Sequence, residues 1–207
     1  MSDRQPTLRE RQRSETRRLI QAQAVGLFTD RGYDTVTVAD VARAAGVSAM
    51  TVYRHFPTKE DLVLVDQPAR LIAERVAASP AGNPLVSRVG GALVDAAAAL
   101  TGGDAAEPAA YRRFLLDCLK LMVATPALRA RYLDSQYALQ QAIIEALGDQ
   151  AADTDTAFRA QAATSACLAA MHTALTRWAE DDGRTELPEL IARALAASVG
   201  DNASLCA

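Results

Sequence analysis

Residues 37–57 hold two short amphipathic patterns separated by a single glycine, and this arrangement most constrains the fold. Thr37 can cap a first helix, whose apolar residues recur at i, i+3, i+4 and i+7. Gly46 can adopt the left-handed conformation that ends this helix, and Ser48 can cap a second helix that Pro57 stops. The stretch therefore predicts two short helices joined by a tight turn.

The second of these helices would present an outward face without a carboxylate. Val52 and Phe56 lie four residues apart and are expected to face inward. The other side chains are small, hydroxylated, aromatic or basic: Ala49, Met50, Thr51, Tyr53, Arg54 and His55. Such a helix fits the recognition helix of a helix-turn-helix, which enters the DNA major groove. The pattern fits equally well a helical hairpin that only packs against its neighbours.

Composition favours an all-α protein. Half of the 207 residues are hydrophobic, which is ample for a core, and the eight prolines lie at segment edges. Neither a secretory leader nor a long apolar run is present, so we expect a cytoplasmic protein without a membrane span. Cys118, Cys167 and Cys206 are too widely spaced for a metal site, and a chain with only two histidines does not fit a metal sensor, so no cofactor is expected.

Charge is distributed unevenly along the chain. Residues 1–62 hold ten lysines and arginines against eight acidic residues, whereas the remainder holds twelve against seventeen. The bias is strongest near the N-terminus, where residues 1–13 read as a basic arm suited to a polyanion. A solvated, disordered tail is the other interpretation of this arm.

Seven further helices are predicted around the two-helix unit. The first begins at Ser14 or Thr16 and ends near Arg31, and a connector helix runs from Thr58 to about Ala78 with Leu71 among its apolar residues. Turn and proline signals then delimit five more segments: 85–100, 107–124, 126–147, 154–180 and 187–198.

The span from Arg13 to Leu64 resembles the DNA-binding domain of the TetR family of bacterial transcriptional regulators. The resemblance lies in two sequence segments, AVGLFTDRGYDTVTVADVARAAGVS and TVYRHFPTKEDL. The resembling span covers about a quarter of the chain. The resemblance implies an N-terminal three-helix headpiece with a helix-turn-helix DNA-binding domain at 14–57. It also implies a C-terminal six-helix ligand-binding and dimerisation bundle at 58–207.

The resemblance also implies roles for single residues. Thr37 and Ser48 would sit close to the DNA backbone, and the residues expected to touch phosphates or neighbouring bases are Thr51, Tyr53, His55 and Lys59. Ala49, Met50 and Arg54 occupy the positions that would read the base sequence. From its chemistry, Arg54 can bond a guanine or grip a phosphate; we favour phosphate because Arg54 lies a full turn beyond the helix start. His55 can also be a residue that hydrogen-bonds the adjacent helix.

The second half of the chain contains no motif, but it offers candidates for a ligand pocket between helices. These are Phe114, Cys118, Met122, Tyr132, Gln136, Met171, His172 and Trp178. A methionine or aromatic stripe of this kind also fits an ordinary core, and His172 fits a satisfied core residue. The segment 154–180 is rich in small residues, and the resemblance implies that it pairs with its copy, together with the last helix, in a homodimer.

These features together predict a homodimeric, sequence-specific repressor that binds double-stranded operator DNA with palindromic sequence and is released by a small-molecule effector. Two alternatives stay open. One is a ligand-independent architectural DNA-binding protein. The other is an all-α enzyme, although the chain lacks the phosphate-loop, zinc-protease and serine-hydrolase motifs.

Overall fold

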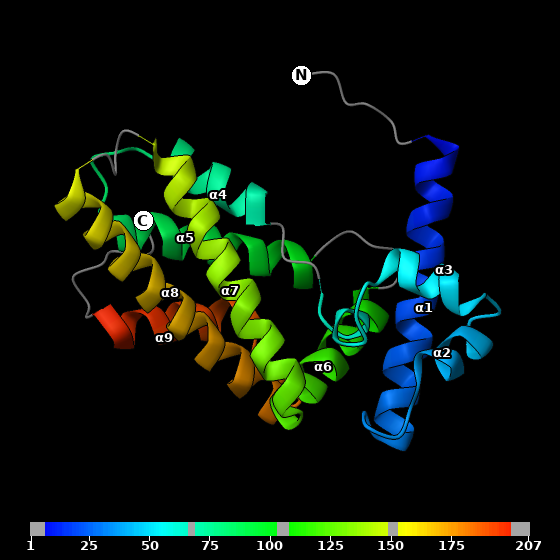
Figure 1. Ribbon diagram of the computed structural model, residues 1–207. Coiled ribbons are helices and arrows are strands. Elements are labelled where there is room, and N and C mark those ends of the chain that lie inside the picture. The colour runs from blue at the N-terminus through cyan, green and yellow to red at the C-terminus, as the bar shows by residue number, and fades with distance from the viewer. Residues whose placement is uncertain (1–6, 66–68, 103–107, 149–152, 200–207) are drawn as a thin grey trace.

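The computed structural model describes residues 7–65, 69–102, 108–148 and 153–199, and every regular element in these ranges is a helix. The all-α prediction is therefore confirmed. The chain divides into a small headpiece of α1 to α3 and a larger bundle of α4 to α9, which stand side by side (Figure 1). No helix in the described ranges is long and apolar enough to cross a membrane.

Helix α1 (Leu8–Arg31) begins well before the predicted start at Ser14. Its N-terminus is fixed by a capping box, in which the Thr7 hydroxyl accepts from the Glu10 N–H at 3.3 Å and the Glu10 carboxylate accepts from the Thr7 N–H at 2.7 Å. The alternative interpretation of residues 1–13 as a disordered tail therefore does not hold for residues 8–13, which are helical; residues 1–6 lie outside the described ranges.

Helices α2 (Val38–Ala44) and α3 (Ala49–His55) confirm the predicted caps. Thr37 and Asp40 form a second capping box at the start of α2, and the Ser48 hydroxyl accepts from the Thr51 N–H at 3.1 Å. Gly46 in the turn has a φ of +67°, the left-handed conformation that glycine adopts without strain.

The predicted continuous connector helix from Thr58 is wrong. Thr58 and Asp61 do cap each other, but the turn that follows is a short 3₁₀ helix, η1 (Glu60–Leu62), and α4 (Ala69–Ala78) is a separate helix. The sequence supplies the reason, because Pro68 has no N–H to donate to the Leu64 carbonyl. The side chain of Gln21 donates to that carbonyl at 3.3 Å.

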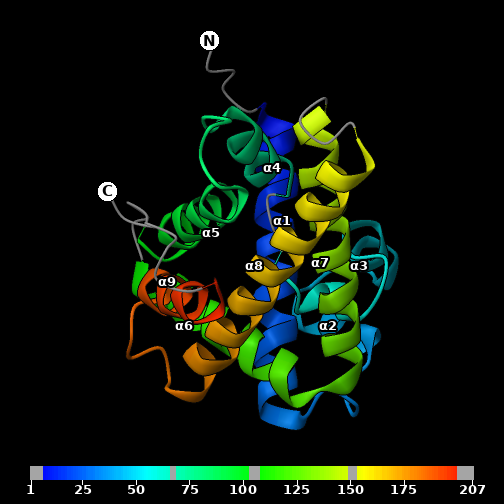
Figure 2. The same ribbon diagram turned by 90° about the vertical axis from the view of Figure 1, so that its left-hand side faces the viewer.

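The bundle helices agree closely with their predicted boundaries. They are α5 (Leu85–Thr101), α6 (Pro108–Ala124), α7 (Pro126–Leu147), α8 (Thr154–Glu180) and α9 (Leu187–Val199). Helix α4 packs on α7, and α9 packs on α8 and α5, whereas α6 reaches across to α1. Helices α8 and α9 lie on the side of the bundle that faces away from the headpiece (Figure 2). Leu71 of α4, one of the apolar residues in the predicted connector helix, is 55% exposed.

Two glycine substitutions provide a matched test of the turn geometry. Gly46→Ala should lower the free energy of unfolding by about 1 kcal/mol, because alanine is strained in the left-handed conformation. Gly26→Ala, in the exposed middle of α1 with no atom near the added Cβ, should raise it by about 0.5–1 kcal/mol. Chemical denaturation, monitored through the loss of helicity, measures both free energies of unfolding. Equal effects of the two substitutions would contradict the left-handed conformation assigned to Gly46.

Candidate functional site

The exposed face of α3 carries side chains able to contact a partner. Met50 is 74% exposed and Tyr53 is 49% exposed, and Arg54 is also exposed. On the opposite side, Val52 and Phe56 are completely buried and hold the helix in the headpiece. The first turn of α3 contains no acidic residue, so nothing on the helix itself repels an anion.

Cap residues flank this face. The hydroxyls of Ser48 and Thr51 lie 3.0 Å apart, and Ser48 is exposed. At the start of α2, the exposed Thr37 gives its hydroxyl proton to the Asp40 carboxylate at 2.6 Å. Hydrogen bonds from Thr37, followed by those from Arg43, lower the pKa of Asp40 to about 2.

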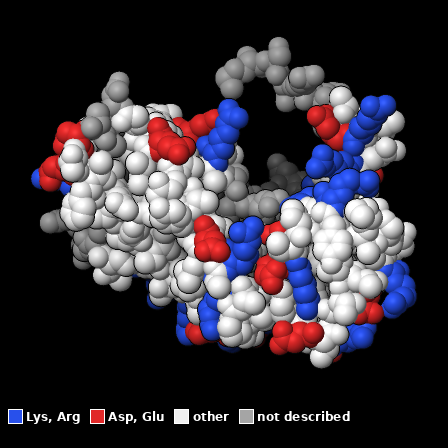
Figure 3. Space-filling view, in the orientation of Figure 1, with Lys and Arg blue, Asp and Glu red and all other residues white. Residues whose placement is uncertain are grey.

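Basic side chains gather on the N-terminal half of α1. The N-terminal half of α1 contributes Arg9, Arg11, Arg13, Arg17 and Arg18, and lysine and arginine dominate this part of the headpiece surface (Figure 3). Arg17 donates to the His55 carbonyl, and the charges of Arg13 and Arg17 act on the His55 imidazole, so these two arginines lie near the end of α3. A solvent-exposed helix beside a basic surface is suited to a polyanion.

His55 was predicted to lie on the outward face of α3, but the structure buries it. Its side chain is 9% exposed, because the last residue of α3 turns towards α1 and the bundle. Burial, followed by the positive charges of Arg13, Arg54 and Arg17, lowers the pKa of His55. This burial leaves little of the side chain accessible for the DNA contact that the sequence suggested.

Lys59 is tied into the headpiece. Its Nζ donates to the Tyr33 carbonyl at 2.7 Å and lies 4.2 Å from the centre of the Tyr33 ring. The Tyr33 hydroxyl in turn donates to Glu60 at 3.1 Å, and burial raises the pKa of Tyr33. Since an ammonium carries three donors, Lys59 can hold this loop and still donate to an external phosphate.

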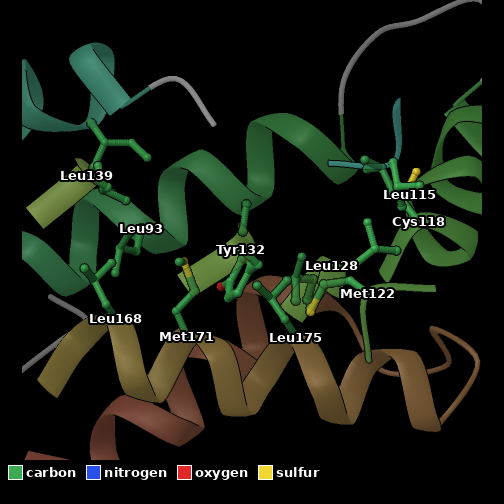
Figure 4. Packing of buried hydrophobic residues seen from close by; sticks show 14 of the residues in the cluster. Leu93, Leu115, Cys118, Met122, Leu128, Tyr132, Leu139, Leu168, Met171 and Leu175 are labelled. Carbon is green, nitrogen blue, oxygen red and sulfur yellow. The ribbon is translucent and has the colours of Figure 1, made fainter. Parts of the chain in front are cut away.

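A cavity of about 660 Å³ lies where the bundle meets the headpiece. Leucine, valine, methionine and aromatic side chains make up most of its lining. Figure 4 shows Leu115, Cys118 and Met122 of α6 together with Tyr132 of α7 and Leu175 of α8, all of which border it. Its volume falls within the range of small-molecule sites, roughly 300–1,000 Å³.

Four of the eight predicted pocket residues line this cavity: Cys118, Met122, Tyr132 and Trp178. The other four, Phe114, Gln136, Met171 and His172, do not border it. Burial raises the pKa of Cys118, so its thiol is a small apolar wall group. Within the described ranges, no three histidine, cysteine, aspartate or glutamate side chains come together in a way that could hold a metal ion.

Sequence reasoning missed the headpiece residues that close the cavity. Arg17, His55 and Asp61 border it, although they lie far in sequence from the α6, α7 and α8 residues that form most of its wall. Asp61 also forms an ion pair with Arg131 of α7, at 3.2 Å, which joins η1 to the bundle. No sequence pattern signals these contacts, since each depends on how the two halves dock.

Comparison with known proteins matches both halves of the chain. A family model described as bacterial regulatory proteins, tetR family, matches residues 20–65, and one described as the MftR C-terminal domain matches residues 101–200. Together the two ranges cover more than half of the chain. The chain belongs to the TetR family.

Individual TetR-family relatives agree with this assignment. The transcriptional regulator TcmR of Streptomyces glaucescens is 35% identical over 139 residues, which is 62% of this chain and 57% of TcmR. The repressor AcnR of Corynebacterium glutamicum is 30% identical over 56% of this chain and 55% of AcnR. The matches thus span little more than half the length of these curated relatives.

The solved structure of a bacterial repressor shows the same fold. NalD of Pseudomonas aeruginosa, described as the secondary repressor of the MexAB-OprM multidrug efflux pump, superposes with a TM-score of 0.54 at 22% identity. The superposition covers 91% of this chain and 98% of NalD, so the two chains share a fold over nearly their whole length.

The two histidines of the chain should both titrate below pH 6.5. Burial is the first cause of the lowered pKa of each, and neighbouring arginines add to it. Because the folded protein then binds protons less readily than the unfolded chain, stability should fall as the pH drops through 6.5. NMR titration of the imidazole signals, assigned by replacing each histidine in turn, measures this; a pKa above 6.5 for His55 would contradict its buried placement.

Proposed function

We propose that this chain is a homodimeric transcriptional repressor that binds a palindromic operator through α3 and is released by a small-molecule effector in the cavity. The observation that carries the proposal is the exposed face of α3, with Met50, Tyr53 and Arg54, together with Arg13 and Arg17 of α1 near the end of this helix. Membership of a family of regulatory proteins supports it.

Within this interface we assign two kinds of contact. Ala49 and Met50 would read bases, since an apolar side chain near the helix start suits the methyl group of thymine. The residues proposed to position the protein on the DNA backbone are Thr37, Ser48, Thr51, Tyr53, Arg54 and Lys59. His55 leaves this set because it is buried.

A single α3 reads only a few base pairs, and therefore we propose that two copies act together. On α8, small side chains are exposed at helical spacing at Ala162, Ser165 and Ala169, and Phe158 on the same helix is 67% exposed. Such a face allows close packing against a second copy. Helix α9, which packs on α8, would complete the interface.

Release by an effector requires that the cavity communicates with α3. The cavity is bordered by the end of α3, by η1 and by the bundle, so an occupant touches both halves of the molecule. A coupling of about 1–3 kcal/mol would change operator affinity roughly 5- to 150-fold.

An architectural DNA-binding protein would behave differently. Fragments selected from genomic DNA for binding should outcompete random DNA by at least 1,000-fold at a physiological salt concentration, as is typical of specific regulators. Affinities measured at two salt concentrations provide the second readout, because each neutralised phosphate adds about 0.9 to the salt slope. Equal affinity for selected and random DNA would favour the architectural alternative, and no DNA binding at all would refute the proposal.

Substitutions on α3 separate reading from positioning. Tyr53→Ala should weaken binding to all operator variants alike, by roughly tenfold, because it removes a contact to the backbone. Met50→Ala should mainly change the preference at one base pair. Binding to a library of single-base operator variants measures both effects, and Tyr137→Ala on the exposed face of α7 is the matched control. A uniform loss for both α3 variants would contradict the division of roles.

A further inference from the structure

One ion pair bridges two walls of the cavity where the headpiece meets the bundle. Asp61 of η1 and Arg131 of α7 form it, and both border the cavity. Four of the α7 residues on the border recur at i, i+3, i+4 and i+7 and so share one face of the helix: Arg131, Asp134, Ser135 and Ala138. Arg131 therefore projects from the face of α7 that is turned towards the cavity.

The geometry of this ion pair leaves room for a better partner. Two N–H groups of the Arg131 guanidinium, on Nε and Nη2, donate to the same oxygen, Oδ1 of Asp61, at 3.3 and 3.2 Å. The second oxygen, Oδ2, accepts from the Thr58 N–H at 3.0 Å. Arginine and carboxylate bind most strongly when two N–H groups meet two oxygens. A ligand carboxylate, which offers both oxygens, can therefore bind Arg131 better than Asp61 does.

Such an exchange of partners would cost little. Asp61 keeps the hydrogen bond from Thr58, and its side chain is partly exposed, so water can replace the guanidinium. The side chain of Arg131 is also partly exposed. Ion pairs in this setting contribute little free energy, because water and salt screen them.

Positive charge favours an anion at this end of the cavity. The charged residues on the border are Arg17, Arg131, Asp61 and Asp134. Two further arginines, Arg13 and Arg54, act on the imidazole of His55, which borders the cavity as well. Among the described residues, four arginines thus act here against two aspartates. A ligand anion meets a favourable field, whereas a ligand cation would be repelled.

The rest of the cavity is apolar. Leu115, Leu119 and Met122 of α6 and Leu175 and Trp178 of α8 line it. A ligand that fills this space needs an apolar body, because the burial of apolar surface drives binding in such a pocket. The two parts of the cavity together fit an amphipathic molecule with one anionic end.

We propose that the effector is an amphipathic carboxylate, whose apolar body fills the cavity and whose carboxylate displaces Asp61 from Arg131. The fork of a guanidinium matches the two oxygens of a carboxylate, so the ligand gains the paired hydrogen bonds that Asp61 does not make. The ligand thereby replaces a contact between headpiece and bundle with a contact of its own.

The position of η1 gives this displacement a regulatory meaning. Lys59 donates to the Tyr33 carbonyl at 2.7 Å, and the Tyr33 hydroxyl donates to Glu60 at 3.1 Å, so η1 is fastened to the headpiece. Asp61 fastens the same turn to α7 through Arg131. Loss of that ion pair therefore loosens the headpiece from the bundle. This regulatory step rests on the function proposed above, whereas the carboxylate contact itself does not.

A matched pair of ligands tests the contact. 4-Cyclohexylbutanoate and 4-cyclohexylbutanamide have nearly the same shape, differ in charge at pH 7 and do not fluoresce. Trp178, the single tryptophan of the chain, borders the cavity and reports occupancy by its fluorescence. The wild-type protein should bind the carboxylate roughly tenfold more tightly than the amide, because hydrogen bonds between two charged groups are the stronger ones.

Two substitutions should change this preference in opposite directions. Arg131→Gln removes the guanidinium and should lower the preference for the carboxylate roughly tenfold. Asp61→Asn removes the competing carboxylate and should raise the preference roughly two- to fivefold. A purely structural role of the ion pair would not give opposite signs. Arg129→Gln, on the same helix but outside the cavity lining, is the matched control and should leave the preference as in the wild type.

Several results would overturn the contact. These are equal binding of the two ligands by the wild-type protein, an unchanged preference in Arg131→Gln, and an unchanged or reduced preference in Asp61→Asn. An equal loss in Arg129→Gln and Arg131→Gln, or the failure of both ligands to bind, would do the same. The two test variants are independent, so one of them decides if the other does not fold.

A DNA-binding measurement separates this contact from the proposed function. At equal occupancy, the carboxylate should weaken operator binding by the wild-type protein more than the amide does. Asp61→Asn should weaken operator binding roughly two- to fivefold without any ligand, because it breaks the same ion pair. If the carboxylate preference depends on Arg131 but operator binding responds to neither change, the contact stands and regulation through it is refuted. If the protein binds no DNA under any condition, the proposed function fails and the contact is judged on the ligand preference alone.

Discussion

The attachment of Arg17 to the end of α3 is the interaction on which the arrangement of the functional surfaces depends. One guanidinium satisfies the last carbonyl of α3 and covers the buried Phe56 ring, and it does so from the middle of α1. Helix α3 is only two turns long and would be unstable alone, so its orientation comes from such tertiary contacts. The exposed face of α3 and the inner end of the cavity are two sides of the same fixed element.

Local signals in the sequence predicted the helices well. Thr37, Gly46 and Ser48 act through hydrogen bonds and dihedral angles within a few residues, and each has its predicted role in the structure. The early start of α1 had such a signal too, in Thr7 and Glu10, which an interpretation based on charge alone overlooked. Pro68 likewise marked the break before α4, although the apolar pattern on either side suggested one helix.

The cavity was predictable only in part, because its shape depends on contacts between distant segments. Cys118, Met122, Tyr132 and Trp178 were suggested by their helical spacing and border it. Arg17 lies 38 residues from the His55 carbonyl it bonds, and Arg131 lies 70 residues from Asp61. No periodicity in the sequence encodes such pairs, so the meeting of headpiece and cavity is visible only in three dimensions.

The separation of η1 from α4 has a mechanical consequence. A continuous helix would be a rigid element and would couple rotations of the bundle to the headpiece whatever side chains surround it. Here residues 63–65, between η1 and α4, are not helical, and the contacts between the halves include α1 against α6 and Asp61 against Arg131. The headpiece is therefore held on the bundle by contacts between side chains. A change in a few of these contacts can alter the angle between headpiece and bundle without rebuilding any helix.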